Sequence, residues 1–280
     1  MKTLTLGYSP CPNDTFIFYA LVHGKINTGD LQFREILEDV ESLNIMARKA
    51  ALDITKVSFH ALGYLREDYC LLRAGVALGK GCGPLVVART DCTMQNLRGL
   101  KIAIPGSLTT AFLLLQLYCP DFRNNIKVLP FNQIIDAVKT GAADAGLIIH
   151  ESRFTYQKAG LKKIIDLGEW WEETTGLPIP LGGIIARRNL GPEIIKKINK
   201  YLRASIEYAF SNRQEPQVYI KQHSQELNDE VIEKHIELYV NNYSLDIGDD
   251  GLLAAEELFR QAEAKGLIEK SSRKLMEQLE

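Results

Sequence analysis

The chain has 280 residues, of which 46% are hydrophobic and 24% are charged, and its formal net charge at pH 7 is -2. This composition is typical of a globular protein with one large core or two smaller ones, and it excludes disorder as the main state of the chain. The small net charge provides no overall field that would attract nucleic acid or an anionic membrane. Any anion-binding site must therefore be local.

The start of the sequence predicts neither export nor membrane insertion. Met1 and Lys2 lead directly into the short segment Thr3–Gly7, without the apolar stretch and cleavage site of a secretory signal. No apolar run approaches the roughly 20 residues that span a bilayer. The five cysteines include no C-x-x-C pair, which favours reduced, packed thiols over a disulfide framework or a zinc site. We therefore expect a cytoplasmic protein without a metal site.

Short apolar runs alternate with segments of helical periodicity along most of the chain, a pattern typical of βα units and a largely parallel sheet. The first set has the order strand, helix, strand, helix, strand: Leu4–Tyr8, Asp14–His23, Leu31–Leu37, Asp39–Ala50 and Ile54–Val57. A second set repeats this order: Lys101–Ile104, Thr109–Tyr118, Ile126–Leu129, Asn132–Thr140 and Ala145–Ile149. The repeated order predicts an α/β fold of two similar lobes.

Two more strands are predicted on either side of the second set, at Pro84–Arg89 and Leu181–Arg187. We interpret them as a pair of crossover strands that act as the hinge between the lobes. The C-terminal part has helical periodicity and predicts helices that pack back on the first lobe, at 192–212, 215–225, 229–241 and 251–264. Lobe one should then comprise residues 1–88 and 185–280, and lobe two residues 89–184.

The loop Ser9–Thr15 follows the first predicted strand, which is where open α/β sheets bind ligands. Two prolines stiffen this loop, and Asn13 or Asp14 is suited to cap the following helix, whose free N–H groups favour an anion. A rigid turn with an ordinary helix cap is an equal alternative. An ionised Asp14 would repel a carboxylate, so it is better suited to capping the helix or to binding a ligand hydroxyl.

The equivalent loop of the second set has the sequence Pro-Gly-Ser-Leu-Thr-Thr at residues 105–110. Its Gly106 lets the backbone approach a ligand closely. The hydroxyls of Ser107, Thr109 and Thr110 lie beside the N-terminus of a predicted helix, which suits a carboxylate. A Ser/Thr-rich helix cap without a ligand is an equal alternative. The loop lacks the lysine and the spacing of a Walker A phosphate loop.

The ends of two predicted strands supply the remaining candidates. Lys56, Val57 and Ser58 end the third strand, where Lys56 would neutralise an anion or simply remain solvated. His150 follows the last strand of the second set, at the sheet edge where catalytic side chains are usually presented. A structural role for His150 is the alternative to a catalytic one. His60, beyond the Lys56–Ser58 segment, is the second candidate for a base.

Other potential ligands and ring-binding residues form weaker patterns. No cluster of His, Cys, Asp and Glu has the sequence spacing of a metal site. Trp170 and Trp171 precede a Gly-Leu-Pro-Ile-Pro segment and would either line a pocket wall for a flat ring or pack between the lobes.

Several of these motifs together resemble a known family, the 1,4-dihydroxy-6-naphthoate synthases of the futalosine route to menaquinone. The resemblance rests on Ser9–Ala20, with the sequence SPCPNDTFIFYA, on Thr55–Phe59, on Gly106–Thr110 and on Gly146–Glu151. The segment Tyr239–Gly248 adds a further match. The likeness spans nearly the full chain, and the first motif is the most specific.

The resemblance implies a periplasmic-binding-protein-like fold of the second type, used as an enzyme without metal or organic cofactor. It implies a carbon–carbon lyase that converts cyclic dehypoxanthinyl futalosine to 1,4-dihydroxy-6-naphthoate, with His150 as the base. The positions that match substrate-contacting residues of the family are Lys56, Val57, Ser58, Thr109 and Thr110. The partner expected from this resemblance is a small anionic substrate.

Two alternatives share the expected fold. A non-catalytic solute-binding protein for a small carboxylate would have the same lobes and anion site, although its usual export signal is not seen here. Chorismate dehydratase of the same pathway does not carry the Ser9–Asp14 motif in this form. Formation of product from the bound ligand would exclude the first alternative, and inertness towards chorismate would exclude the second.

Overall fold

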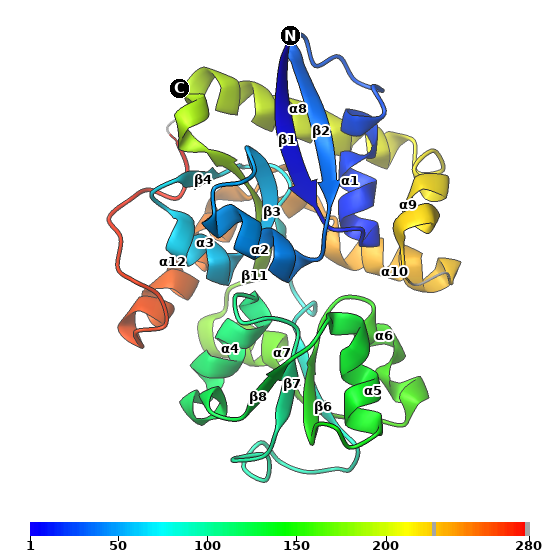
Figure 1. Cartoon of the computed structure of the whole chain (residues 1–280), viewed down its shortest axis with the longest axis vertical. Helices are drawn as coiled ribbons and strands as arrows, with labels where there is room; N and C mark the ends of the chain where they lie inside the picture. Colours follow the sequence, from blue (N-terminus) through cyan, green and yellow to red (C-terminus); the bar gives the residue numbers. More distant parts are fainter. Residues whose placement is uncertain (226–227, 278–280) are drawn as a thin grey trace.

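A computed structural model describes residues 1–225 and 228–277 of the chain. It has two lobes, each built around its own β-sheet with helices against the sheet (Figure 1). The lobe that contains the N-terminus is the upper one in Figure 1. Residues 226–227 and 278–280 of the predicted first lobe lie outside the described part. Within the described part, no helix is both long enough and apolar enough to cross a membrane.

The first sheet contains six strands: β1 (Lys2–Tyr8), β2 (Leu31–Leu37), β3 (Ile54–Ser58), β4 (Tyr69–Leu71), β5 (Ala77–Gly79) and β11 (Ile179–Arg187). The strand order is β2-β1-β3-β11-β4, and β5 pairs with β11. Strand β1 is parallel to β2 and β3, whereas β11 is antiparallel to β3, β4 and β5. All five residues of β3 are buried, as expected for a strand near the middle of a covered sheet.

The helices of the first lobe are α1 (Pro12–Val22), α2 (Val40–Arg48), α3 (Phe59–Leu65), α8 (Pro192–Ser211), α9 (Gln217–His223), α10 (Asp229–Tyr239), α11 (Asn242–Leu245) and α12 (Gly248–Ala264). Helix α1 packs against α8, α9 and α10. Helix α8 buries Ile195, Ile198, Leu202 and Ile206, which are spaced three or four residues apart and so form one apolar stripe. The Ser205 hydroxyl on this stripe donates a hydrogen bond to the Ile17 carbonyl of α1 at 2.6 Å.

The second sheet contains β6 (Leu85–Ala88), β7 (Ile102–Ile104), β8 (Ile126–Val128), β9 (Ala145–Ile148) and β10 (Lys162–Asp166), in the order β10-β6-β9-β7-β8. Its helices are α4 (Thr110–Tyr118), α5 (Ile134–Lys139), α6 (Ser152–Thr155) and α7 (Leu167–Thr175). Short 3-10 turns lie at Pro120–Arg123, Phe131–Gln133, Tyr156–Ala159 and Arg188–Leu190. Helix α4 is buried along nearly all of its length, because it packs between the lobes against α3, α7 and α12.

The two predicted sets of strands and helices are confirmed, but the predicted crossover strands need a correction. Strand β6 lies wholly in the second sheet and β11 wholly in the first, so neither strand runs between the lobes. The chain passes between the sheets at residues 80–84 and 176–178 instead. Apolar runs reveal that a strand is buried but not which strand it pairs with. Because β6 belongs to the second sheet and β11 to the first, lobe limits within residues 80–84 and 176–178 fit the two sheets better than the predicted limits at 88 and 184.

The lobes contact each other through both apolar and polar groups. One cluster of buried apolar side chains is continuous from α3 and α12 of the first lobe to α4 and β7 of the second. On the other side, Glu41 of α2 accepts hydrogen bonds from the Leu108 N–H at 3.0 and 3.2 Å. A Cβ on Gly106 would lie 2.4 Å from the Glu41 carboxyl carbon, so this close approach requires glycine. The arrangement is therefore that of a closed cleft.

We expect Glu41→Ala to shift the chain towards an open cleft, because the substitution removes the carboxylate that joins α2 to the loop of the second lobe. Small-angle scattering should show a larger radius of gyration for this variant than for the wild type. Glu38→Ala is the matched control, since Glu38 is an exposed neighbour on the same segment. Equal radii for the wild type and Glu41→Ala would show that the apolar contacts alone hold the cleft closed.

Candidate functional site

A cavity of about 660 Å³, counting its open mouth, lies between the two lobes. Polar residues of both lobes line it: Ser9, Asn13, Asp14, Lys56 and Ser58 from the first, and Thr109, Thr110 and His150 from the second. Most of the residues predicted as a site are thus brought together. Val57 lies outside the cavity because side chains alternate along a strand, and it points into the core. Ser107 also lies outside and is exposed.

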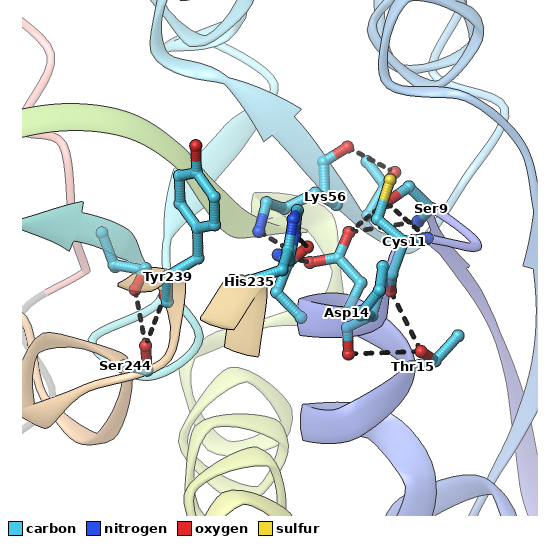
Figure 2. A network of polar contacts seen from close by, with 12 residues as sticks. Ser9, Cys11, Asp14, Thr15, Lys56, His235, Tyr239 and Ser244 are labelled. Atoms are coloured by element: carbon cyan, nitrogen blue, oxygen red, sulfur yellow. Dashed lines mark hydrogen bonds and ion pairs between the residues drawn. The ribbon is translucent and has the colours of Figure 1, made fainter. Parts of the chain in front are cut away.

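A buried ion pair forms the floor of the site in the first lobe (Figure 2). The Lys56 Nζ lies 2.9 Å from Asp14 Oδ1, and both side chains are less than a tenth exposed. The Asn13 amide donates to the same oxygen at 2.8 Å, and the Ser9 hydroxyl donates to Asp14 Oδ2 at 2.8 Å. Two buried charges are stable only when each is paired and hydrogen-bonded in this way. Lys56 is consequently a neutralised cation whose remaining N–H groups are available to a ligand.

The predicted helix cap at Asn13 or Asp14 is wrong. Helix α1 begins at Pro12, and Cys11 is its N-cap residue. The ring of Pro12 has the φ angle of a first helical residue, so the helix begins earlier than the polar residues suggested. The side chains of Asn13 and Asp14 are therefore within the first turn. They turn towards Ser9 and Lys56 instead of capping the helix.

His150 lies two residues beyond the end of β9 and has a backbone φ of 56°, a left-handed conformation that is uncommon for any residue other than glycine. Such a conformation costs on the order of 1–3 kcal/mol and is found preferentially at functional sites. The imidazole ring lies edge-on to Phe131, with centroids 5.0 Å apart. Burial lowers the pKa of His150 to about 4, although the charge of Asp14 acts in the opposite direction. The ring is therefore neutral at neutral pH and can accept a proton.

A second histidine, His235 of α10, lies behind His150 and was not predicted as part of the site. The two rings are nearly parallel, with an interplanar angle of 19° and centroids 6.1 Å apart. His235 Nε2 lies 2.9 Å from Asn13 Oδ1. Because the Asn13 amide nitrogen donates to Asp14, its oxygen must accept, so His235 Nε2 carries the proton. His235 thus connects α10 to the Asp14–Lys56 pair, as Figure 2 shows.

The hydroxyl groups predicted to bind a carboxylate in the second lobe already have protein partners. Thr109 caps α4 by accepting from the Phe112 N–H at 3.3 Å, and its own hydroxyl donates to the Gly106 carbonyl. The Thr110 hydroxyl donates to the Leu181 carbonyl of β11 at 2.6 Å. These bonds leave hydroxyl lone pairs, and no further hydroxyl proton, to face the cavity. The binding of a carboxylate by this loop remains a prediction. Glu41 accepts a hydrogen bond from a backbone N–H of the same loop.

The weaker candidates lie away from the cavity. His60 is buried in α3, where burial lowers its pKa to about 4, and it is not a cavity-lining residue. Trp171 is fully buried and donates from Nε1 to the Pro178 carbonyl at 3.1 Å. Trp170 packs edge-on against Tyr118, with ring centroids 5.5 Å apart. The alternative of core packing therefore holds for both tryptophans.

The fold and the enclosed interlobe site define a two-lobed protein of the periplasmic-binding-protein fold. An alkanesulfonate-binding protein from Xanthomonas axonopodis has this fold, with a TM-score of 0.71 and 13% identity over 96% of this chain and 94% of its own. A solved structure from Archaeoglobus fulgidus is more similar, with a TM-score of 0.90 and 39% identity over 95% of this chain and 98% of its own.

Sequence comparison identifies the family. Residues 4–264 match the model of a family described as menaquinone biosynthesis. A 1,4-dihydroxy-6-naphtoate synthase of Thermus thermophilus is 50% identical over 98% of this chain and 99% of its own. The synthase of Streptomyces coelicolor is 45% identical over 95% of each chain. The chain belongs to this family of menaquinone biosynthesis enzymes, the 1,4-dihydroxy-6-naphthoate synthases, as the sequence motifs predicted.

The ion pair gives a prediction about stability. We expect Asp14→Asn and Lys56→Met each to lower the free energy of unfolding by about 3–5 kcal/mol, because each leaves one buried charge unpaired. The double variant should lose much less than the sum of the two, since it buries no charge. Urea denaturation of the four proteins measures this cycle. Additive losses would show that the two charges do not depend on each other.

Proposed function

We propose that the substrate of this enzyme is cyclic dehypoxanthinyl futalosine, that the product is 1,4-dihydroxy-6-naphthoate, and that His150 is the general base. The observation that carries this proposal is the neutral imidazole of His150, held in a left-handed backbone conformation on the wall of the interlobe cavity. The names of the relatives and the resemblance of the Ser9–Ala20 motif support the choice of substrate.

The reaction requires little more than a positioned base and a dry site. Neutral His150 would take the proton of a substrate hydroxyl. The electron pair of that oxygen would then form a carbonyl as the adjacent carbon–carbon bond breaks. The pair from the broken bond would remain on the ring fragment, whose aromatisation favours the step. Closure of the lobes would exclude water and fix the hydroxyl near the imidazole.

The charges around the cavity suit a small anionic substrate with several hydroxyls. Lys56 can donate to a carboxylate or to a hydroxyl oxygen while Asp14 keeps the pair neutral. Asp14 also reduces the attraction of the site for an anion, so the binding of a carboxylate here would depend on hydrogen bonds more than on net charge. Thr109 and Thr110 add hydroxyl lone pairs from the opposite lobe, which suit a substrate hydroxyl as donor.

Replacing His150 by Gln should lower turnover by roughly 10²–10⁴-fold while the substrate still binds, because positioned acid–base catalysis contributes about that factor. Steady-state kinetics on the cyclic substrate and a separate binding measurement test both parts. His60→Gln is the control, since His60 is a buried histidine that lies outside the cavity. A nearly normal rate for His150→Gln, together with a lost rate for a folded His60→Gln, would place the base on the other lobe.

The pH dependence of the reaction should reflect the lowered pKa of His150. The base must be neutral, so activity is present above its pKa and is lost as the pH falls through it. With a pKa of about 4, kcat/KM should stay level from pH 7 to 5 and fall only below that range. A circular dichroism control at each pH separates this loss from unfolding. An inflection at the ordinary histidine pKa, near ~6.5, would show that His150 is solvated in the free enzyme.

A further inference from the structure

Three potential metal ligands from both lobes meet beside the cavity. Cys11 precedes α1 in the first lobe, and His150 and Glu151 follow β9 in the second. One ligand atom from each of the three lies within 4.8 Å of the other two. Cys11 and Glu151 are buried, and His150 lines the cavity, which gives an ion a way in. The sequence spacing did not predict this group, because 138 residues lie between Cys11 and His150.

The chemistry of the three donors suits a thiophilic divalent ion. A thiolate, an imidazole and a carboxylate are all ligands that Zn²⁺ accepts, with bonds of about 2.0–2.3 Å. A tetrahedral ion with such bonds holds its ligand atoms roughly 3–4 Å apart. The limit of 4.8 Å is about 1 Å longer than this spacing, so the three side chains would have to move closer together by a small amount on binding an ion. Three protein ligands would leave a fourth position for water.

His235 provides a second and independent indication of a cation. Its Nε2 donates to Asn13 Oδ1, so Nδ1 has only a lone pair. This Nδ1 is buried, has no hydrogen-bond partner among residues 1–225 and 228–277, and lies 4.0 Å from Glu151 Oε2. A buried lone pair without a donor is costly, and it is more so beside a carboxylate. Metal-binding histidines typically have this arrangement, with the second ring nitrogen donating to an oxygen.

The neighbouring Asp14–Lys56 pair is already neutral, so it adds no net charge beside the three ligands. A divalent ion binds cysteine as the thiolate and displaces the thiol proton.

We propose that Cys11, His150 and Glu151 bind Zn²⁺ or a similar thiophilic divalent ion, and that this ion inhibits the enzyme. The bound ion would coordinate a ring nitrogen of His150 and would join the two lobes in the closed state. The proposed inhibition rests on the proposed role of His150 as the base, whereas the proposed metal binding does not depend on that role. The test therefore measures binding by a signal that does not require turnover.

Co²⁺ is the probe for binding, because it takes the same ligands as Zn²⁺ and has an intense charge-transfer band when a thiolate is bound. Wild-type protein should show this band with saturation at one equivalent, and Zn²⁺ should displace it. Cys11→Ser should lose the band, and Glu151→Gln should bind Co²⁺ at least tenfold more weakly. Cys92→Ser is the matched control, since Cys92 is only partly buried and would take up an adventitious surface ion.

Three results of the Co²⁺ titration would overturn the proposed site. These are the absence of a saturable band in the wild type, survival of the band in folded Cys11→Ser, and loss of the band in Cys92→Ser alone. Circular dichroism confirms the fold of each variant. If Cys11→Ser does not fold, the tenfold weakening in Glu151→Gln decides the question, and unchanged binding in that variant overturns the site.

A kinetic measurement separates the metal site from the proposed function. Zn²⁺ should inhibit turnover of the cyclic substrate by the wild type, and Cys11→Ser should require at least tenfold more Zn²⁺ for the same inhibition. A Cys11-dependent Co²⁺ band without any inhibition would confirm the site and contradict the inhibitory role, together with that of His150 as base. No turnover by metal-free wild type, with the band present, would contradict the proposed substrate and leave the site intact.

Discussion

The buried pair of Lys56 and Asp14 is the interaction on which the site depends. It joins the middle of β3 to the first turn of α1, and its hydrogen bonds extend to Ser9 after β1 and, through Asn13, to His235 on α10. One charge without the other would be unstable in this interior. Three segments far apart in the sequence, residues 9–14, β3 and α10, must therefore be in place before this network is complete. The ion pair can therefore form only when the first lobe is correctly folded.

His150 brings a different constraint from the second lobe. Its left-handed backbone conformation at the end of β9 directs the imidazole towards the first lobe, where it lies parallel to His235. The ring is held edge-on against Phe131. Burial in the closed cleft keeps the ring neutral. As the base that we propose, His150 would be suited to its task only when the lobes are together, which would couple the chemistry to the closed conformation.

The sequence predicted the parts of this protein that depend on local patterns. Alternating apolar and helical periodicity gave both sheets, and loop position gave most of the cavity, including Asp14, Lys56 and His150. Local patterns could not predict which side chains contact each other across the fold. The start of α1 was misplaced because an aspartate such as Asp14 can cap a helix or form an ion pair, and the sequence does not distinguish the two roles. His235 was missed because its role depends on how α10 packs. The strands β6 and β11 were wrongly predicted to be a pair of crossover strands, because the sequence of a buried strand does not specify its neighbours.

The loop at 105–110 shows how one fold can support different uses. In sequence it offers a backbone N–H and hydroxyls to an anion, but in the structure Glu41 of the opposite lobe accepts from the Leu108 N–H. A carboxylate of the protein thus takes a place that a ligand carboxylate could occupy, and it does so only when the cleft is closed. A loop that would bind a solute here instead helps to hold the lobes together. The charged and titratable groups that line the cavity are then the Asp14–Lys56 pair and His150, beside the hydroxyls of Ser9, Ser58, Thr109 and Thr110.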